Sequence, residues 1–370
     1  MRFALSEDQV ALRDAVRRFL ADKSPIDRAC EPAHPVGYDP ALWSQMAEQL
    51  GLQAITIPED YGGAGATDLE LSVVLEEMGR ALTSSPYFAT IVLAANAIMQ
   101  SRDHSAMQDL LPSIAAGGRL ATLAWTEPGR GWHTDDMSTH ADPADGGWSL
   151  TGTKSHVLDG ETADWILVVA TTASGLGLFL VDTAEHQPTR RPLAVVDRTR
   201  PQADVTFDRS PARLIGGAGE GGQTLERTLD LAAVGLAAEQ VGGARRCLEL
   251  AVGYAKERTQ FGRPIGSFQA IKHKCADMLL QVESGWAAAY YAAWTASHDD
   301  SELPATACLA QSYCSEVFAH AATENVQIHG GIGFTWEHEA QLHLKRAKSS
   351  ELLFGDPAHH RARLAERIGL

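Results

Sequence analysis

A short corner between two helical stretches carries side chains suited to binding a phosphate. Residues 257–269 read ERTQFGRPIGSFQ, in which two glycines and a proline interrupt the helical pattern. The guanidinium of Arg258 can bind a phosphate through two parallel hydrogen bonds. Thr259, Phe261 and Gln269 add a hydroxyl, an aromatic ring and an amide. The alternative for this segment is an ordinary helix end with a surface arginine and a packed ring.

A second segment has the composition of a backbone that a ligand can approach closely. Residues 327–335 read QIHGGIGFT, with three glycines in four positions. Glycine has no Cβ, so a ligand can come near the main chain at Gly330 and Gly331. A plain helix cap is the simpler alternative, but it needs only one glycine. Gln327 precedes the glycines and adds an amide to the same place.

The sequence around these segments divides into three regions. Residues 1–117 carry apolar side chains at helical spacing and predict an α-helical domain. Residues 118–221 hold short strand-like runs without helices between them, which predicts a middle antiparallel β domain, a barrel or a sandwich. Residues 222–370 predict four long amphipathic helices, the first from Thr224 to Gln260 and the fourth from about Trp336 to Phe354, and hence a C-terminal four-helix bundle in an α+β fold. Two basic pairs in the bundle, Arg245–Arg246 and Lys345–Arg346, are expected on solvated faces.

Composition argues against several classes of function. The net charge of −16 is unfavourable for nucleic-acid binding, which needs a cationic face. The longest apolar run is too short to span a bilayer and the N-terminus has no apolar signal segment, so we expect no membrane span and a cytoplasmic location. The five cysteines are odd in number and include no Cys-x-x-Cys pair, which predicts reduced thiols and no metal site.

Both motifs and the order of the three regions resemble the acyl-CoA dehydrogenase family, flavoenzymes that oxidise acyl-CoA thioesters. The resemblance covers essentially the whole chain and implies FAD as the cofactor, an acyl-CoA substrate and an electron-transfer flavoprotein as acceptor. It implies that residues of both segments hold the FAD of a neighbouring subunit: Arg258, Thr259, Phe261, Gln269, Gln327, Gly330 and Gly331. Residues 125–129, Trp-Thr-Glu-Pro-Gly, resemble the family's loop beside the flavin ring, where the Thr126 hydroxyl can hydrogen-bond the ring edge.

The sequence departs from the family where the flavin ring reacts. Trp132 stands where the family usually has a small serine. The family's Trp and Thr that contact the flavin correspond to His156 and Leu158, and a leucine cannot hydrogen-bond the flavin N5 atom.

The family's catalytic carboxylate is missing as well. The reaction needs a base for the α proton, which is typically worth ~10²–10⁴-fold, while a β hydride passes to the flavin. The resemblance places the usual base at Phe354 and the position used by a smaller group of members at Ala232. Glu239 is a weak substitute, because it shares a helix face with Ala232 but lies ~10 Å along the axis. Glu351 and Asp356 flank Phe354 and are expected to point elsewhere.

These losses are confined to one kind of position, which is what a partner subunit would show. Residues implied in a neighbour's FAD site are present, whereas those implied at the chain's own flavin ring and substrate are replaced. The leading hypothesis is a base-lacking subunit of a bacterial α2β2 acyl-CoA dehydrogenase. One alternative is a self-sufficient homotetrameric acyl-CoA dehydrogenase with a non-standard base such as Glu239. Another, from a different class, is a flavin-free scaffold or binding protein on this fold.

Overall fold

The structure is a computed structural model that describes residues 4–26, 37–132, 134, 137–144 and 146–370, so Cys30 lies outside the described residues. The chain forms two compact units, which are described one at a time. Unit 1 contains residues 1–32, 67–83 and 233–370, and unit 2 contains residues 33–66 and 84–232. No helix in the described ranges is long and apolar enough to cross a membrane.

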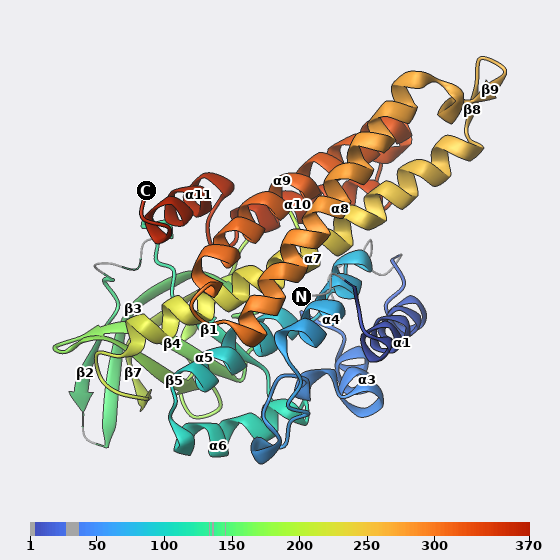
Figure 1. Cartoon of the computed structure of the whole chain (residues 1–370). Coiled ribbons are helices and arrows are strands. Elements are labelled where there is room, and N and C mark those ends of the chain that lie inside the picture. The colour runs from blue at the N-terminus through green and yellow to red at the C-terminus, as the bar shows by residue number, and fades with distance from the viewer. Residues whose placement is uncertain (1–3, 27–36, 133, 135–136, 145) are drawn as a thin grey trace. The chain divides into compact units, whose positions relative to one another are not determined.

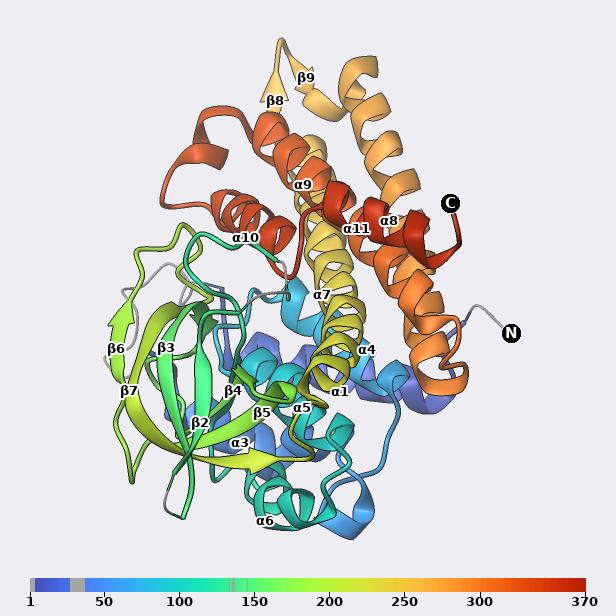
Figure 2. The ribbon, with the colours of Figure 1, turned by 90° about the vertical axis from the view of Figure 1, so that its left-hand side faces the viewer.

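Unit 2 is built around a β-barrel (Figure 2). Its strands are β1 (Ala121–Ala124), β2 (His140–Ala144), β3 (Gly147–Leu158), β4 (Trp165–Thr172), β5 (Gly175–Asp182), β6 (Thr189–Pro192) and β7 (Gln202–Ile215). Strands β4, β2, β3, β7 and β5 pair in that order, and β5 pairs back with β4 to close the barrel. Most pairings are antiparallel, as predicted, but β1 and β2 each pair in parallel with β4. Apolar side chains such as Leu150, Phe179 and Phe207 fill the interior.

The helices of unit 2 precede the barrel. They are α3 (Pro40–Leu50), α5 (Asn96–Gln100) and α6 (His104–Ala115), with short 3-10 turns η1 (Leu52–Ala54) and η2 (Glu59–Tyr61). Residues Phe88–Ala95 form a π-helix, η3, whose side chains are all buried. The hydroxyl of Thr90 donates a 3.0 Å hydrogen bond to the carbonyl of Ala121, which ties η3 to β1.

Unit 1 contains the C-terminal helices and two N-terminal ones. They are α1 (Glu7–Lys23), α4 (Asp68–Arg80), α7 (Gly221–Glu257, which begins in unit 2), α8 (Gln269–His298), α9 (Leu303–His329), α10 (Ala340–Leu352) and α11 (Pro357–Arg367). Figure 1 shows α8, α9 and α10 beside the later turns of α7 as a bundle. A hairpin of β8 (Thr259–Gln260) and β9 (Arg263–Pro264) follows α7, and the turn η4 (Ile265–Ser267) leads into α8. The predicted α+β fold class is confirmed.

Two helix ends differ from their prediction. The first bundle helix was expected to continue to Gln260, but it ends at Glu257 because Thr259 and Gln260 form strand β8. The fourth helix was expected from about Trp336, but α10 begins at Ala340, after the 3-10 turn η5 (Gly330–Phe334).

Two glycines bring α4 and α7 into backbone contact within unit 1. A Cβ on Gly242 would lie 1.8 Å from the carbonyl oxygen of Glu76. A Cβ on Gly79 would lie 2.0 Å from the carbonyl oxygen of Glu239. Because no side chain fits at either position, glycine is required where the two helices cross.

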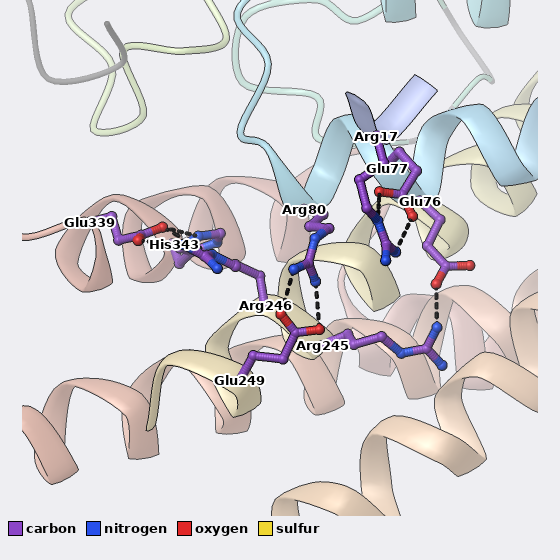
Figure 3. Close-up of polar contacts among 9 residues, drawn as sticks. All are labelled: Arg17, Glu76, Glu77, Arg80, Arg245, Arg246, Glu249, Glu339 and His343. Atoms are coloured by element: carbon purple, nitrogen blue, oxygen red, sulfur yellow. Dashed lines mark hydrogen bonds and ion pairs between the residues drawn. The ribbon is translucent and has the colours of Figure 1, made fainter. Parts of the chain in front are cut away.

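Ion pairs surround this helix crossing (Figure 3). Arg245 on α7 pairs with Glu76 on α4 at 2.5 Å. Arg246 pairs with Glu339, just before α10, through a 2.7 Å contact. The prediction that Arg245 and Arg246 form a solvated face is therefore wrong. Glu76 lies 169 residues from Arg245 in sequence, a separation that no local pattern reveals.

Candidate functional site

The corner after α7 forms a tight hairpin that presents an aromatic ring outward. Thr259 pairs with Pro264 and Gln260 pairs with Arg263, which leaves Phe261 and Gly262 as a two-residue loop. Both loop residues have positive φ, 53° and 74°, which is the pattern of a type I′ turn. Asn-Gly is the usual sequence there, and a bulky L-residue in left-handed conformation costs roughly 1–2 kcal/mol. The Phe261 side chain is nevertheless 91% exposed, so this chain gains little burial from it.

The neighbouring side chains of this corner also face solvent. Arg258, Thr259 and Gln269 are all exposed. The Arg263 guanidinium lies over the Phe268 ring at 4.2 Å from its centroid, and the Phe261 ring meets the Phe268 ring edge-on at 6.1 Å. The hairpin thus offers cations, rings and an amide on one exposed segment, as the sequence indicated.

The glycine segment after α9 is equally open. Gln327, Gly330 and Gly331 are exposed. Gly330 has φ of 65°, which accounts for a glycine there. Gly331 has no positive φ, and a Cβ on it would meet no atom within 4 Å. The packing of this chain therefore does not require a glycine at position 331, whereas a ligand approaching the backbone would.

The loop after β1 is held firmly against β3. The Thr126 hydroxyl donates to the carbonyl of Ser155, and the Ser155 amide donates back to the Thr126 carbonyl at 2.9 Å. Because the Thr126 hydroxyl already donates its proton within the chain, it can only accept a hydrogen bond from an external group. His156 has φ of 54° in a register shift of β3, and its ring hydrogen-bonds Gln202 at 2.9 Å. Leu158 is buried.

A buried ion pair beneath this loop was not found by sequence reasoning. Lys154 is fully buried, and its ammonium donates to Glu127 at 2.8 Å and to the Trp125 carbonyl at 3.2 Å. Burial lowers the pKa of Lys154 to about 8, whereas Glu127 raises it. Burial would raise the pKa of Glu127, but hydrogen bonds from Lys154, Ser138 and Thr139 hold it far below its usual range. The available signal was composition, because Lys154 is the only lysine between Lys23 and Lys256.

Neither expected base position carries a carboxylate. Phe354 lies two residues after the end of α10, with a buried side chain and φ of 63°. Ala232, on α7, is also fully buried. The two acids that flank Phe354 have local roles: Glu351 pairs with Lys348 at 2.7 Å, and Asp356 accepts the His359 amide as the N-cap of α11.

Glu239, the weak candidate base, lies in a buried ion pair. Its carboxylate contacts the Arg346 guanidinium of α10 at 2.6 Å, and the two side chains are 6% and 3% exposed. Arg346 is therefore not on a solvated face, contrary to the prediction. A carboxylate held by a guanidinium has its charge neutralised and its orientation fixed, which is the arrangement of a structural pair.

The described residues contain no group of His, Cys, Asp and Glu side chains that could hold a metal ion. Cys247, Cys275, Cys308 and Cys314 are free thiols. Burial raises the pKa of Cys314 to about 12, so that thiol is protonated at neutral pH. Burial, with the nearby cations His359, Arg363 and Arg367, lowers the pKa of His360 to about 3. These groups offer neither a thiolate nucleophile at Cys314 nor a cationic imidazole at His360.

Three family models match successive parts of the chain. They are the acyl-CoA dehydrogenase N-terminal domain over residues 6–118, the middle domain over 122–210 and the C-terminal domain over 219–369. Acyl-CoA dehydrogenase IpdE2 of Mycolicibacterium smegmatis is 35% identical to the chain over 368 residues, covering 98% of this chain and 100% of the relative.

Solved structures share the whole fold. The Tcur3481–Tcur3483 steroid ACAD, in a variant form, superposes with a TM-score of 0.89 and 32% identity over 98% of both chains. The ChsE4–ChsE5 complex from Mycobacterium tuberculosis superposes with a TM-score of 0.90 and 26% identity over 100% of this chain and 99% of that chain.

Proposed function

Because the chain belongs to the acyl-CoA dehydrogenase family, we propose that it is a base-lacking subunit that completes the FAD sites of a second acyl-CoA dehydrogenase chain in a heterotetramer. The family is FAD-dependent and oxidises acyl-CoA thioesters at the α and β carbons. In this assembly the second chain supplies the carboxylate that removes the α proton. This chain supplies the exposed corner and the glycine bend.

The observation that carries the proposal is the state of Phe261. Its backbone is strained and its ring is 91% exposed, so the edge-on contact with Phe268 offsets little of the strain. Gly331 supports the same conclusion, because a Cβ there would meet no atom of the chain within 4 Å and packing does not require a glycine. A ligand shared with another subunit would account for both.

The residues of the corner fit the pyrophosphate and adenine end of FAD. Arg258 can pair with the pyrophosphate, Phe261 offers a ring face, and Gln269 and Gln327 offer amides. The bend at Gly330 and Gly331 lets the phosphates approach the main chain. When bound, FAD supplies the acceptor for the substrate hydride. An electron-transfer flavoprotein is the proposed acceptor of the electrons.

The residues at the chain's own base positions support the proposal that the second chain supplies the catalytic carboxylate. Phe354 and Ala232 carry no proton-accepting group, and Glu239 is held by Arg346. Two similar structures are named for complexes of two different chains, and one of them is a steroid ACAD. We therefore extend the proposal to a bulky, steroid-derived acyl-CoA bound mainly by the second chain.

The test is the flavin content of this chain with and without a catalytic subunit. The chain is purified alone and after co-expression with an acyl-CoA dehydrogenase chain of the same host that keeps the catalytic glutamate. Flavin absorbance per protomer and native mass are measured for both. We expect little FAD on the chain alone, and an α2β2 complex that holds FAD and reduces a dye with acyl-CoA. About one FAD per chain in an active homotetramer would instead establish the self-sufficient enzyme, and no flavin in either sample would favour a scaffold.

A further inference from the structure

A stack of three rings, Tyr254, His329 and His338, joins the chain segments beside the hairpin and the glycine bend in unit 1. The His329 ring stacks on Tyr254 with centroids 4.3 Å apart and planes inclined by 28°. The His338 ring is also near, with its centroid 4.3 Å from that of His329 and its plane tilted by 47°. His329 itself is 5% exposed, whereas Tyr254 and His338 are partly exposed.

Each ring of the stack belongs to a different element. Tyr254 is in the last turn of α7, and its carbonyl accepts the Arg258 amide at 2.8 Å. His329 is the last residue of α9 and directly precedes Gly330. The His338 ring accepts the Ala340 amide at 3.1 Å, so it caps the start of α10. The stack therefore joins the root of the hairpin, the root of the glycine bend and the start of α10.

The orientation of the His329 ring is fixed from within its own helix. Its Nδ1 donates to the carbonyl of Asn325 at 2.8 Å, which assigns the proton to Nδ1 and leaves Nε2 as an acceptor. The carbonyls of the last helical turn need such partners. One hydrogen bond therefore fixes the His329 ring and satisfies a carbonyl in the last turn of α9.

We infer that His329 is a positioning residue that keeps the glycine bend in register with the Arg258 hairpin. It touches no phosphate itself and acts through Tyr254 and Gly330. The inference rests on the proposed function only in taking the two segments to bind one FAD, and the geometry of the stack is independent of the ligand.

The protonation state of His329 gives the stack a pH dependence. Burial is the main cause that lowers its pKa below the ordinary 6.5, and His338 adds to that effect. The groups that face it are the Tyr254 ring from α7, the Asn325 carbonyl from α9, and His338 and Glu339 from the segment before α10. The His329 ring is therefore neutral at pH 7 and gains a proton only below its ordinary pKa of 6.5.

The experiment compares His329→Leu with His329→Phe in the FAD-loaded assembly of this chain. Leucine removes the ring, and we expect FAD affinity to fall about tenfold, which corresponds to 1.4 kcal/mol. Phenylalanine keeps a flat ring but removes the titrating nitrogens, so affinity should recover to within about threefold and lose its decline at acidic pH. His320→Leu, on the same helix, is the control and should leave FAD affinity unchanged.

Two further measurements separate positioning from stability. In a double-mutant cycle, Tyr254→Leu and His329→Leu should be non-additive for FAD affinity, because both break one stack. Amide hydrogen exchange should rise in residues 258–264 as well as 330–334 when His329 is leucine, although only the second segment adjoins it in sequence. Additive effects, or faster exchange confined to residues 330–334, would overturn the inference. If the wild-type assembly holds no FAD, the proposed function fails, and the exchange pattern still decides the role of His329.

Discussion

The hairpin with the glycine bend and the region around Glu239 and Phe354, both in unit 1, differ in how far their side chains are exposed. Around Arg258 and Gly331 the side chains face solvent, and Phe261 adopts a strained turn that the chain does not compensate by burial. Around Glu239 and Phe354 the side chains are buried and packed, and the carboxylate is neutralised by Arg346.

This difference distinguishes residues that serve the fold from residues that serve a partner. A charged group that is buried and paired within the chain has a structural role, because it contributes to the stability of the fold. A group left exposed in an unfavourable conformation needs an external reason. The first description fits Glu239, and the second fits Phe261.

Breaking the Glu239–Arg346 pair should have the largest effect and should act on stability. In Glu239→Gln the buried Arg346 loses its charged partner, which typically costs about 3–5 kcal/mol. Denaturant unfolding of the isolated chain measures this loss. Glu249→Gln is the matched control, because Glu249 pairs with Arg80 but is 42% exposed, and its loss should be below about 1 kcal/mol. A Glu239→Gln chain of normal stability in an assembly without activity would show that Glu239 is the base.

Lowering the pH should reduce the stability of the buried region around Glu339 before it affects the exposed hairpin and glycine bend. Burial would raise the pKa of Glu339, but its interactions with His343 and Arg246 lower it from 4.5 to about 2. A lowered carboxyl pKa gives stability that is complete above pH 4.5 and is lost as the pH falls towards 2, in total about 3 kcal/mol. Burial also lowers the pKa of His343, which destabilises in the same direction from its ordinary 6.5 downwards. In denaturant titrations from pH 7 to 3, Glu339→Gln should flatten the slope below pH 4.5. An unchanged slope would show that Glu339 does not cause the loss of stability at acidic pH.

Filling the open space at Gly331 should affect the ligand without affecting the fold. A Cβ on Gly331 would meet no atom within 4 Å, so in Gly331→Val the melting temperature should stay nearly the same. The added side chain occupies the proposed path of the phosphates, and FAD affinity of the assembly should fall on the order of 100-fold, which corresponds to about 2.8 kcal/mol. Gly253→Val, also in open space but on α7, controls for the substitution itself. Full FAD binding by Gly331→Val would show that no ligand approaches there.

The smallest expected effect concerns the geometry of one cation. Arg258→Lys keeps the charge but loses the planar fork that binds a phosphate through two hydrogen bonds. FAD affinity, measured by equilibrium dialysis of the assembly, should fall about tenfold, the effect of 1.4 kcal/mol. Arg361→Lys, at an exposed pair with Glu316, should change nothing. Equal losses in both variants would point to a general charge effect.

The sequence was sufficient for the architecture because local periodicity reports local structure. Helical spacing, strand-like runs and glycine punctuation predicted the α+β fold, and the hairpin and the glycine bend are present where their glycines indicated. The end of α7 was missed because Thr259 and Gln260 continue the polar pattern of the helix but pair with Pro264 and Arg263 instead.

The partners of buried charges could not be predicted in this way. Arg346 and Glu239 are 107 residues apart, and Arg246 and Glu339 are 93 apart, so only the tertiary fold joins them. Read locally, an arginine beside another basic residue looks like a solvated face. The same limit hid the Tyr254–His329–His338 stack, whose members come from three separate elements.

At Phe261, selection for stability of the isolated chain and selection for function of the assembly favour different residues. Asparagine fits a left-handed turn position better than phenylalanine, so Phe261→Asn should make the isolated chain slightly more stable. The same change removes the ring that the assembly is proposed to use. In lineages selected only for stability of the isolated chain, asparagine would replace phenylalanine at this turn. Phenylalanine would persist where fitness depends on the assembled enzyme, in the usual trade between stability and activity.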